Sequence, residues 1–331
     1  MGDKPLELVG IGNAIVDVLS RTDDDFLKTH GVTKGAMTLI DAARAEALYE
    51  AMGPGIEVSG GSLANATAGF AALGGRAAYI GKVKNDQLGR VFAHDLRSTG
   101  VRFTTPMAND GDATARCLVL VTPDGQRSMN TYLGACVQLS EADVDPDLIA
   151  AARVVYLEGY LWDPPEAKKA FRKAMALAHE GGGEVALTLS DAFCVERWRN
   201  EFRDLVDHHV DILFANEAEL LSLFETDDFT AAIAALHGRV KIAAITRSEQ
   251  GSVILHDGAA HEIAAEPVAR VVDATGAGDL YSAGFLYGYT QGLDLPMAGR
   301  IASICAAEVI SHYGARPESD LRNLVERALA A

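Results

Sequence analysis

The chain has few cysteines, a shortage of basic residues and no long hydrophobic run. Its four cysteines, Cys117, Cys136, Cys194 and Cys305, lie far apart and form no C-x-x-C pair, which favours reduced thiols over a disulfide framework or a zinc site. Lys and Arg number 29 against 46 Asp and Glu, and the net charge of −17 disfavours nucleic acid and anionic membranes as partners. The N-terminus has no signal-peptide apolar region, and no apolar run is long enough to span a bilayer. These absences predict a soluble, cytoplasmic protein.

Several nucleotide-binding and metal-binding motifs are also missing. No G-x-x-x-x-G-K-[ST] run occurs, so the chain is not a P-loop enzyme, and Gly10-Ile11-Gly12 lacks the third glycine of a dinucleotide-binding fingerprint. The nine histidines form no H-E-x-x-H zinc motif. The acidic charge still permits a nucleotide substrate, because a local anion-binding loop and Mg²⁺ can offset a distant negative field.

Strand and helix patterns alternate regularly after Ser140. Such alternation indicates βαβ units and a mostly parallel sheet with helices on both faces. Strands are expected at Val154–Leu157, Val185–Leu189, Ile212–Phe214 and Ile242–Thr246, and helices at Glu166–His179, Val195–His208 and Glu217–Phe224.

Two segments depart from this alternation. Residues 14–40 mix a charged run with short apolar pieces, and residues 101–132 contain an alternating stretch, Ala115–Val121, followed by a Pro123-Asp124-Gly125 turn. That turn between two alternating runs is typical of a β-hairpin. We therefore predict a main α/β domain from residues 1–13, 41–100 and 133–331, and a small, discontinuous β lid from residues 14–40 and 101–132.

One stretch of small residues suggests an anion-binding site. After the apolar pair Val271-Val272, the run Gly276-Ala277-Gly278 precedes an amphipathic helical pattern, with Asp279 in its first turn. Glycine lets a backbone approach a ligand closely, and the free N–H groups at a helix start attract anions. A carboxylate beside such a site could act as a base in phosphoryl transfer to a hydroxyl. From these residues alone, an ordinary glycine-rich helix start explains the pattern equally well.

Two segments carry a resemblance to a known family. The run Asp273-Ala274-Thr275-Gly276-Ala277-Gly278-Asp279 resembles the C-terminal signature of the ribokinase-like (PfkB) carbohydrate kinases. Gly60-Gly61-Ser62-Leu63-Ala64-Asn65-Ala66, continuing through residues 81–89, resembles their N-terminal signature, and Asn216-Glu217-Ala218-Glu219 their N-x-x-E motif. The resemblance extends over essentially the whole chain. It implies a three-layer α/β/α ribokinase-like fold with a small β-sheet lid, and phosphotransfer from ATP with Mg²⁺, with K⁺ as a candidate activator.

The resemblance also implies roles for individual residues on the ATP side. Asp279 would be the catalytic base, and the backbone N–H groups of Gly276, Ala277 and Gly278 would hold charge on the transferred phosphoryl group. Asn216 and Glu219 would bind Mg²⁺ through water; the alternative is a helix N-cap with a capping box. The ATP site would comprise Asn216, Thr246, Ser248, Gly251, Thr275, Gly276 and Gly278. Arg247 departs from the apolar residue often found there, and its role stays open.

A second group of residues would bind the acceptor. Asn13, Asp17, Gly60, Gly61 and Asn65 match family positions that grip hydroxyl groups, although Asp17 could instead be a turn residue after the first strand. On the lid hairpin, Arg127, Met129 and Thr131 match positions that approach the phosphates and cover the acceptor; a purely structural hairpin is the alternative.

The acceptor itself is predicted less directly. Leu187–Phe193 and Val210–Glu217 resemble adenosine kinases more than hexose kinases, which would make Phe193 a stacking surface for a nucleoside base. The resemblance therefore implies adenosine as the acceptor. A kinase of ribose, fructose or a keto-deoxy sugar acid is the alternative, and a non-catalytic nucleoside or sugar sensor is a third. A monomer and a lid-mediated homodimer both remain open.

Overall fold

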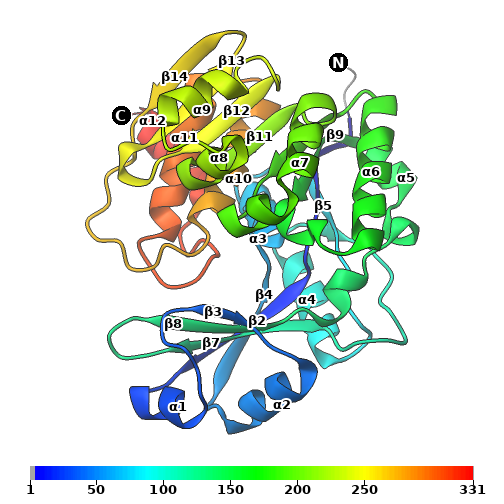
Figure 1. Cartoon of the computed structure of the whole chain (residues 1–331), viewed down its shortest axis with the longest axis vertical. Helices are drawn as coiled ribbons and strands as arrows, with labels where there is room; N and C mark the ends of the chain where they lie inside the picture. Colours follow the sequence, from blue (N-terminus) through cyan, green and yellow to red (C-terminus); the bar gives the residue numbers. More distant parts are fainter. Residues whose placement is uncertain (1–3, 331) are drawn as a thin grey trace.

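The computed structural model describes residues 4–330 and contains two β-sheets (Figure 1). The larger sheet has nine strands in the order β14-β13-β12-β11-β10-β9-β1-β5-β6. Strand β13 runs antiparallel to both neighbours, and the other strands pair in parallel. The bounds are β1 Leu6–Ile11, β5 Ala77–Ile80, β6 Arg102–Phe103, β9 Ala152–Glu158, β10 Glu184–Thr188, β11 Ile212–Asn216, β12 Ile242–Thr246, β13 Ser252–His256 and β14 Ala259–Ile263.

Helices cover both faces of this sheet, and each face has its own apolar core. One core contains residues of α5 Pro146–Ala150, α6 Pro165–Glu180, α7 Ala192–His208, α8 Glu217–Phe224 and α9 Phe229–Leu236. The other contains residues of α3 Ser62–Ala72, α4 Gln87–Ser98, α10 Ala277–Thr290 and α11 Leu295–Val309, with α12 Leu321–Ala330 packed outside them. The α/β/α fold class expected from the sequence is confirmed. No helix within residues 4–330 is long and apolar enough to cross a membrane.

The smaller sheet has five strands in the order β3-β8-β7-β2-β4. Their bounds are β2 Ile15–Arg21, β3 Met37–Leu39, β4 Gly55–Gly60, β7 Ala115–Val121 and β8 Arg127–Tyr132. Helices α1 Asp24–Thr29 and α2 Ala42–Ala51 lie on the side of this sheet away from the larger domain (Figure 1). Strand β4 comes from the segment 41–100, which the sequence analysis assigned to the main domain, so the small sheet draws on three segments of the chain. We call this part of the molecule the lid.

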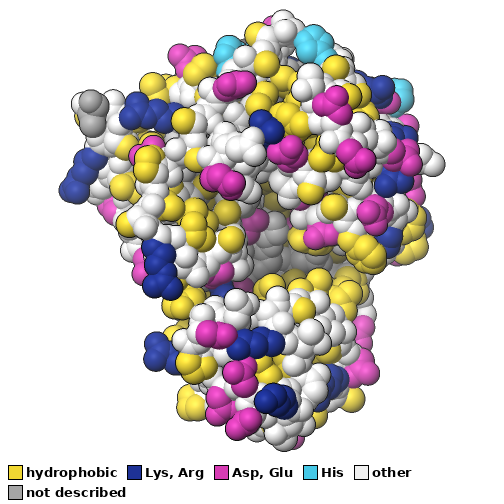
Figure 2. Space-filling view, turned by 60° about the vertical axis from the view of Figure 1, so that its left-hand side comes forward, with side chains coloured by type: hydrophobic (Ala, Val, Ile, Leu, Met, Phe, Trp, Pro, Cys, Tyr) yellow, Lys and Arg dark blue, Asp and Glu magenta, His cyan; other side chains and the backbone are white. Residues whose placement is uncertain are grey.

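Two short connections join the sheets and place the lid over the ends of the parallel strands. Strand β1 passes into β2 through Gly12-Asn13-Ala14, and β4 ends one residue before α3 begins. Figure 2 shows a hollow between the lid and the larger domain, bordered by apolar side chains and by acidic ones. The residues of these two connections, 12–14 and 61, therefore lie where the domains meet, and we call them the hinge.

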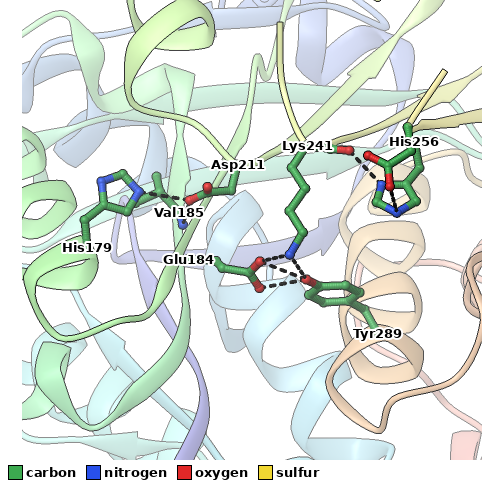
Figure 3. Close-up of polar contacts among 8 residues, drawn as sticks. His179, Glu184, Val185, Asp211, Lys241, His256 and Tyr289 are labelled. Carbon is green, nitrogen blue, oxygen red and sulfur yellow. Dashed lines mark hydrogen bonds and ion pairs between the residues drawn. The ribbon is translucent and has the colours of Figure 1, made fainter. Parts of the chain in front are cut away.

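The opposite ends of the strands carry a polar cluster (Figure 3). Glu184 at the start of β10 accepts hydrogen bonds from Tyr289 Oη (2.9 and 2.8 Å) and pairs with Lys241, which itself donates to Tyr289 Oη (2.9 Å). These bonds tie the starts of β10 and β12 to the end of α10. Lys241 also lines a surface pocket of about 650 Å³, but its charge is already paired, so we assign this cluster a structural role.

Candidate active site

Asp279 brings the two signature segments together. It lies in the first turn of α10, and its Oδ1 accepts a hydrogen bond from Ser62 Oγ (2.6 Å), while its Oδ2 accepts one from Asn65 Nδ2 (3.1 Å). Helices α3 and α10 can approach this closely because Gly69 faces Leu280; a Cβ on Gly69 would lie 2.5 Å from the leucine Cδ1. Residues 214 and 217 positions apart in the chain thus form one polar site.

The surroundings of Asp279 give its carboxyl group the properties of a base. Burial raises the pKa of Asp279, while the hydrogen bonds from Ser62 and Asn65 and the charge of Arg316 lower it. Its place in the first turn of α10 favours the ionised form as well. A carboxylate whose pKa lies above its ordinary value is a better proton acceptor than a free one.

The loop before α10 exposes backbone amides. Gly276 has a left-handed conformation (φ 82°), and a Cβ there would lie 2.8 Å from Ala315 Cα, so the turn requires glycine. A Cβ on Gly278 would meet nothing within 4 Å, so open space lies beside this amide. The Ala277 N–H, which the resemblance assigned to the phosphoryl group, instead donates to the Ala274 carbonyl within the turn (3.2 Å). An anion can approach this helix start closely.

Asp17 lies on β2, and two glycines leave room for it and for the neighbouring backbone where the lid joins the larger domain. A Cβ on Gly60 would lie 2.3 Å from Asp17 Oδ2, and Gly61 (φ 96°) leaves room for the Asn13 carbonyl oxygen, which a Cβ would approach to 2.2 Å. Burial, with a smaller contribution from the nearby Asp279, raises the pKa of Asp17 to about 6, although the charges of Arg127 and Arg316 oppose the shift. The two carboxylates therefore share one site.

Two buried amide oxygens in this site have no hydrogen-bond partner within residues 4–330. They are Asn13 Oδ1 and Asn65 Oδ1. Buried polar atoms in native proteins are nearly always satisfied by protein, water or ligand. Together with the carboxylates of Asp17 and Asp279, they form a set of acceptors that suits a molecule bringing several hydroxyl donors.

Glu158, which the sequence analysis did not identify, fixes the acceptor side of the site. It ends β9, is fully buried, and its Oε1 accepts hydrogen bonds from the backbone N and the Nδ2 of Asn13, both at 2.7 Å. Its Oε2 accepts from the Leu63 amide (3.0 Å). Burial raises the pKa of Glu158 to about 7, although these hydrogen bonds oppose the shift. A glutamate directly after the apolar run Val154–Leu157 was the available sequence signal.

The lid contributes residues from β8. Arg127 forms an ion pair with Asp273, the first residue of the C-terminal signature, and so links the lid to the anion-binding loop. Thr131 lies opposite Cys117, which lies opposite Asp17, and Thr131 Oγ1 donates to the cysteine Sγ (3.3 Å). Met129 precedes Thr131 by two residues, on the same face of β8, and lies opposite Val119 on β7.

Comparison with known proteins identifies the family. Residues 54–321 match the family model described as pfkB family carbohydrate kinase. The chain belongs to this family. The crystal structure of a probable sugar kinase protein from Rhizobium etli CFN 42 has a TM-score of 0.92 and 50% identity, covering 99% of this chain and 100% of that one. The crystal structure of adenosine kinase from Sinorhizobium meliloti has a TM-score of 0.90 and 51% identity, covering 98% of this chain and 99% of that one. A 5-dehydro-2-deoxygluconokinase from Clostridium perfringens is 26% identical over 77% of this chain and 78% of that protein.

Membership of the pfkB family confirms the resemblance drawn from the two signatures. The protein is a phosphotransferase with an alcohol group as acceptor, and the family implies ATP as the phosphoryl donor. Its acceptor belongs to the carbohydrates or nucleosides, since both sugar kinases and adenosine kinases are among the similar proteins.

The N-x-x-E motif lies at the start of α8. Asn216 caps α8 in a complete capping box: Asn216 Oδ1 accepts from the Glu219 amide (2.9 Å), and the Glu219 carboxylate accepts from the backbone N (3.0 Å) and Nδ2 (2.7 Å) of Asn216. Burial raises the pKa of Glu219 to about 7. Within residues 4–330 no group of three or more His, Cys, Asp or Glu could hold a metal. Both carboxylate oxygens are engaged, which suits contact with Mg²⁺ through water rather than direct ligation.

The loop after β12 turns tightly and packs against the end of β14. Thr246 ends the strand, Ser248 has a positive φ of 52°, and a Cβ on Gly251 (φ 82°) would lie 2.0 Å from the Ile263 carbonyl oxygen. The side chain of Arg247 is engaged by other protein groups: its Nε donates to Glu217 Oε2 (2.9 Å), and its guanidinium lies 3.9 Å from the centroid of the Phe229 ring. Arg247 thus joins this loop to α8 and α9.

Phe193 lies at the start of α7 and is 62% exposed. Its ring is covered on one side by Arg197, whose Cζ lies 4.6 Å from the ring centroid. The exposed part of the ring is available for stacking.

Proposed function

We propose that this pfkB kinase transfers the γ-phosphoryl group of MgATP to a primary hydroxyl of a ribose-containing acceptor, and that adenosine, giving AMP, is that acceptor. The observation that carries the proposal is the acceptor site itself. Asp279 stands at the start of α10, bonded to Asn65 and near enough to Asp17 to raise its pKa, and the amide oxygens of Asn13 and Asn65 have no partner within residues 4–330. Such a set of acceptors suits a polyhydroxylated ring held beside a base.

In the proposed reaction, Asp279 accepts the proton of the attacking hydroxyl. The N–H groups of Gly276 and Gly278, at the start of α10, stabilise the charge that develops on the transferred phosphoryl group. Asp17, held in place by Gly60, binds two further hydroxyls and orients the ring. Lid closure excludes water, which would otherwise hydrolyse ATP.

Adenosine is supported by two further observations. The adenosine kinase from Sinorhizobium meliloti is 51% identical to this chain over nearly its full length. The lid sheet also exposes apolar side chains at its edge, with Met37 54% and Leu39 57% exposed beside Met129 and Thr131. An apolar surface of this kind suits a purine base better than the hydroxyl groups of a free sugar.

A kinase of a free sugar is the second candidate, because similar proteins include a probable sugar kinase and a 5-dehydro-2-deoxygluconokinase. A polyol would use the same carboxylates and amides. A non-catalytic sensor has no support, since the chain keeps Asp279 and belongs to a kinase family.

An acceptor screen separates these candidates. Purified protein is incubated with MgATP and adenosine, inosine, guanosine, ribose, fructose or 2-keto-3-deoxygluconate, and ADP formation is followed together with the phosphorylated product. We expect the highest kcat/KM for adenosine, with AMP as product. Turnover of a free sugar with none of adenosine would refute the nucleoside assignment and leave the kinase class intact.

The proposal extends to cations and assembly. Mg²⁺ enters with ATP near Asn216 and Glu219, and a monovalent cation such as K⁺ bound by backbone carbonyls raises activity; replacing K⁺ by tetramethylammonium in the assay tests this. Within the part of the chain that the structure describes, the lid edges β3 and β4 are each unpaired on one side, and Ile56 on β4 is 70% exposed. A lid-mediated homodimer and a monomer are therefore the two assemblies to be distinguished. Sedimentation at several protein concentrations distinguishes them.

A further inference from the structure

Arg316 lies in the loop between α11 and α12, outside both family signatures, yet its guanidinium reaches the hinge of the lid. Its Nε and Nη2 donate to the carbonyl oxygen of Ser59 on β4 (3.2 and 2.9 Å), and Nη2 also donates to Ser59 Oγ (2.9 Å). Its Nη1 donates to the carbonyl oxygen of Ala64 on α3 (3.1 Å). One side chain therefore links the end of β4 to α3, the helix that carries Ser62 and Asn65.

The neighbours of Arg316 touch the anion-binding loop. Ala315 packs directly against Gly276, and the Gly314 amide donates to Asp273 Oδ2 (3.0 Å). The same short loop thus contacts the start of α10 on one side and β4 and α3 on the other. A displacement of Arg316 would therefore disturb both the anion-binding loop before α10 and the acceptor side of the site at β4 and α3.

The charge of Arg316 is not neutralised by a direct ion pair within residues 4–330. Its hydrogen-bond partners there are two carbonyl oxygens and one hydroxyl. Among acidic residues Asp95 has the largest influence on its pKa, and the two are linked through Ser59, whose N and Oγ donate to Asp95 Oδ2 (2.7 and 2.6 Å). The positive charge therefore acts on the carboxylates of the site. It lowers the pKa of both Asp17 and Asp279.

We propose that Arg316 is a positioning residue for phosphoryl transfer: its fixed positive charge stabilises the carboxylates of Asp17 and Asp279, and its hydrogen bonds keep β4 and α3 in place beside the loop that precedes α10. The inference rests on the proposed roles of Asp17 and Asp279. Arg316 itself need not touch either substrate. Its contribution is to keep two neighbouring carboxylates ionised in a buried site where each disfavours the charge of the other.

The pH dependence of kcat/KM for the acceptor measures the effect of the Arg316 charge on the pKa values of Asp17 and Asp279. Other titratable groups nearby must be taken into account. Besides Arg316, the groups around Asp279 are Asp17 on β2, Tyr79 on β5, Tyr156 and Glu158 on β9, and Tyr160 after it; Arg127 and Cys117 also face Asp17. Only the carboxyl groups titrate in the acid limb. After burial, the hydrogen bonds from Asn13 and Leu63 and the charge of Asp279 have the largest influence on the pKa of Glu158.

The test compares three variants with the wild type over pH 5–9. Arg316→Gln removes the charge and keeps a side chain that can donate hydrogen bonds; Arg316→Lys keeps the charge. Asp95→Asn removes a negative charge near Arg316 and leaves an oxygen that can accept from Ser59. Arg322→Gln is the matched control, because Arg322 is an exposed arginine of the same C-terminal region that pairs with Glu326.

We expect the acid limb of Arg316→Gln to move to higher pH by about 0.5–1 unit, less than the 1–3 units of a direct ion pair. At pH 6, near the expected midpoint of the wild-type limb, this shift lowers kcat/KM by roughly 2–5-fold. Arg316→Lys should keep most of the wild-type profile. Asp95→Asn should move the limb slightly in the opposite direction, to lower pH, an effect that structural damage would not produce. Arg322→Gln should match the wild type.

Two outcomes would overturn the proposal. The first is a folded Arg316→Gln protein, with a melting temperature near that of the wild type, whose acid limb is unchanged. The second is an equal loss for Arg316→Gln and Arg316→Lys at every pH, which would indicate a packing role only. Should Arg316→Gln not fold, an unshifted limb in Asp95→Asn would count against the proposal by itself. Wild-type turnover in Asp279→Asn would instead show that the assignment of the base is wrong, and the inference would fall with it.

Discussion

Replacing Asp279 by asparagine removes the proposed base with little change of shape. An asparagine oxygen can still accept from Asn65 Nδ2, and its NH₂ group can donate to Ser62 Oγ, so both contacts of the wild-type carboxylate (3.1 and 2.6 Å) have a neutral counterpart. Exchanging a charge-assisted hydrogen bond for a neutral one costs about 1 kcal/mol. Burial raises the pKa of Asp279, which means that the buried charge is itself unfavourable, and its removal offsets that cost. We therefore expect a melting temperature within a few degrees of the wild type.

The loss of activity should be much larger than the change in stability. A positioned general base contributes about 10²–10⁴-fold in rate, which corresponds to about 2.7–5.4 kcal/mol of transition-state stabilisation. The acceptor should still bind, because Asp17, Asn13 and Asn65 are unchanged. The effect should therefore appear in kcat, with the dissociation constant of the acceptor changed only a few-fold.

Rapid-quench measurement of product formation at saturating MgATP and adenosine, together with calorimetric titration of the acceptor, tests both halves of this expectation. Asp257→Asn is the control, because this aspartate lies in the exposed turn between β13 and β14, and its side chain is 86% exposed. A kcat for Asp279→Asn within threefold of the wild type would refute the assignment of the base. A large loss that came entirely from weakened acceptor binding would refute it equally.

Three further predictions follow from the geometry. Gly60→Ala places a Cβ 2.3 Å from Asp17 Oδ2, so steady-state kinetics should show a KM for the acceptor raised at least about tenfold with the KM for ATP unchanged. Gly276→Ala should lower the free energy of unfolding by at least about 1–2 kcal/mol, because its φ is 82°, whereas Gly278→Ala should keep its melting temperature and lose ATP turnover, since its Cβ enters the open space beside the anion-binding loop. Because burial raises the pKa of Asp17 to about 6 and that of Asp279 above its usual value, both carboxyls hold protons to higher pH than free ones; kcat/KM should fall as the pH drops through about 6, and an acid limb near pH 4 would contradict this.

The fold class and part of the candidate site could be predicted from the sequence, because both depend on patterns of neighbouring residues. The alternation of strands and helices after Ser140 required a parallel sheet, and the Pro123-Asp124-Gly125 turn between two alternating runs required a hairpin, which the structure has as β7 and β8. Strand β4 was missed because its glycines and its short alternation resemble a loop. Its place in the lid depends on pairing with β2, a contact that no local pattern reports.

The remaining site residues depend on contacts between distant parts of the chain. The resemblance of Gly60–Ala66 and Asp273–Asp279 to family signatures implied that Asn65 and Asp279 meet, and the structure gives their hydrogen bond. Arg316 lies in an irregular loop with no periodic pattern, so only the folded chain reveals that it reaches the hinge. For Asn216 the sequence left a helix cap and a metal contact open, and the structure has the capping box.

The most direct test of the central claim is a crystal structure with adenosine and a non-hydrolysable ATP analogue. The account predicts that the 5′-hydroxyl lies within about 2.6–3.2 Å of the Asp279 carboxylate, with the other ribose hydroxyls on Asp17 and on the side-chain oxygen of Asn13 or Asn65, and the γ-phosphate against the amides before α10. An acceptor bound elsewhere, with Asp279 out of reach of every hydroxyl while the γ-phosphate occupies that loop, would contradict it.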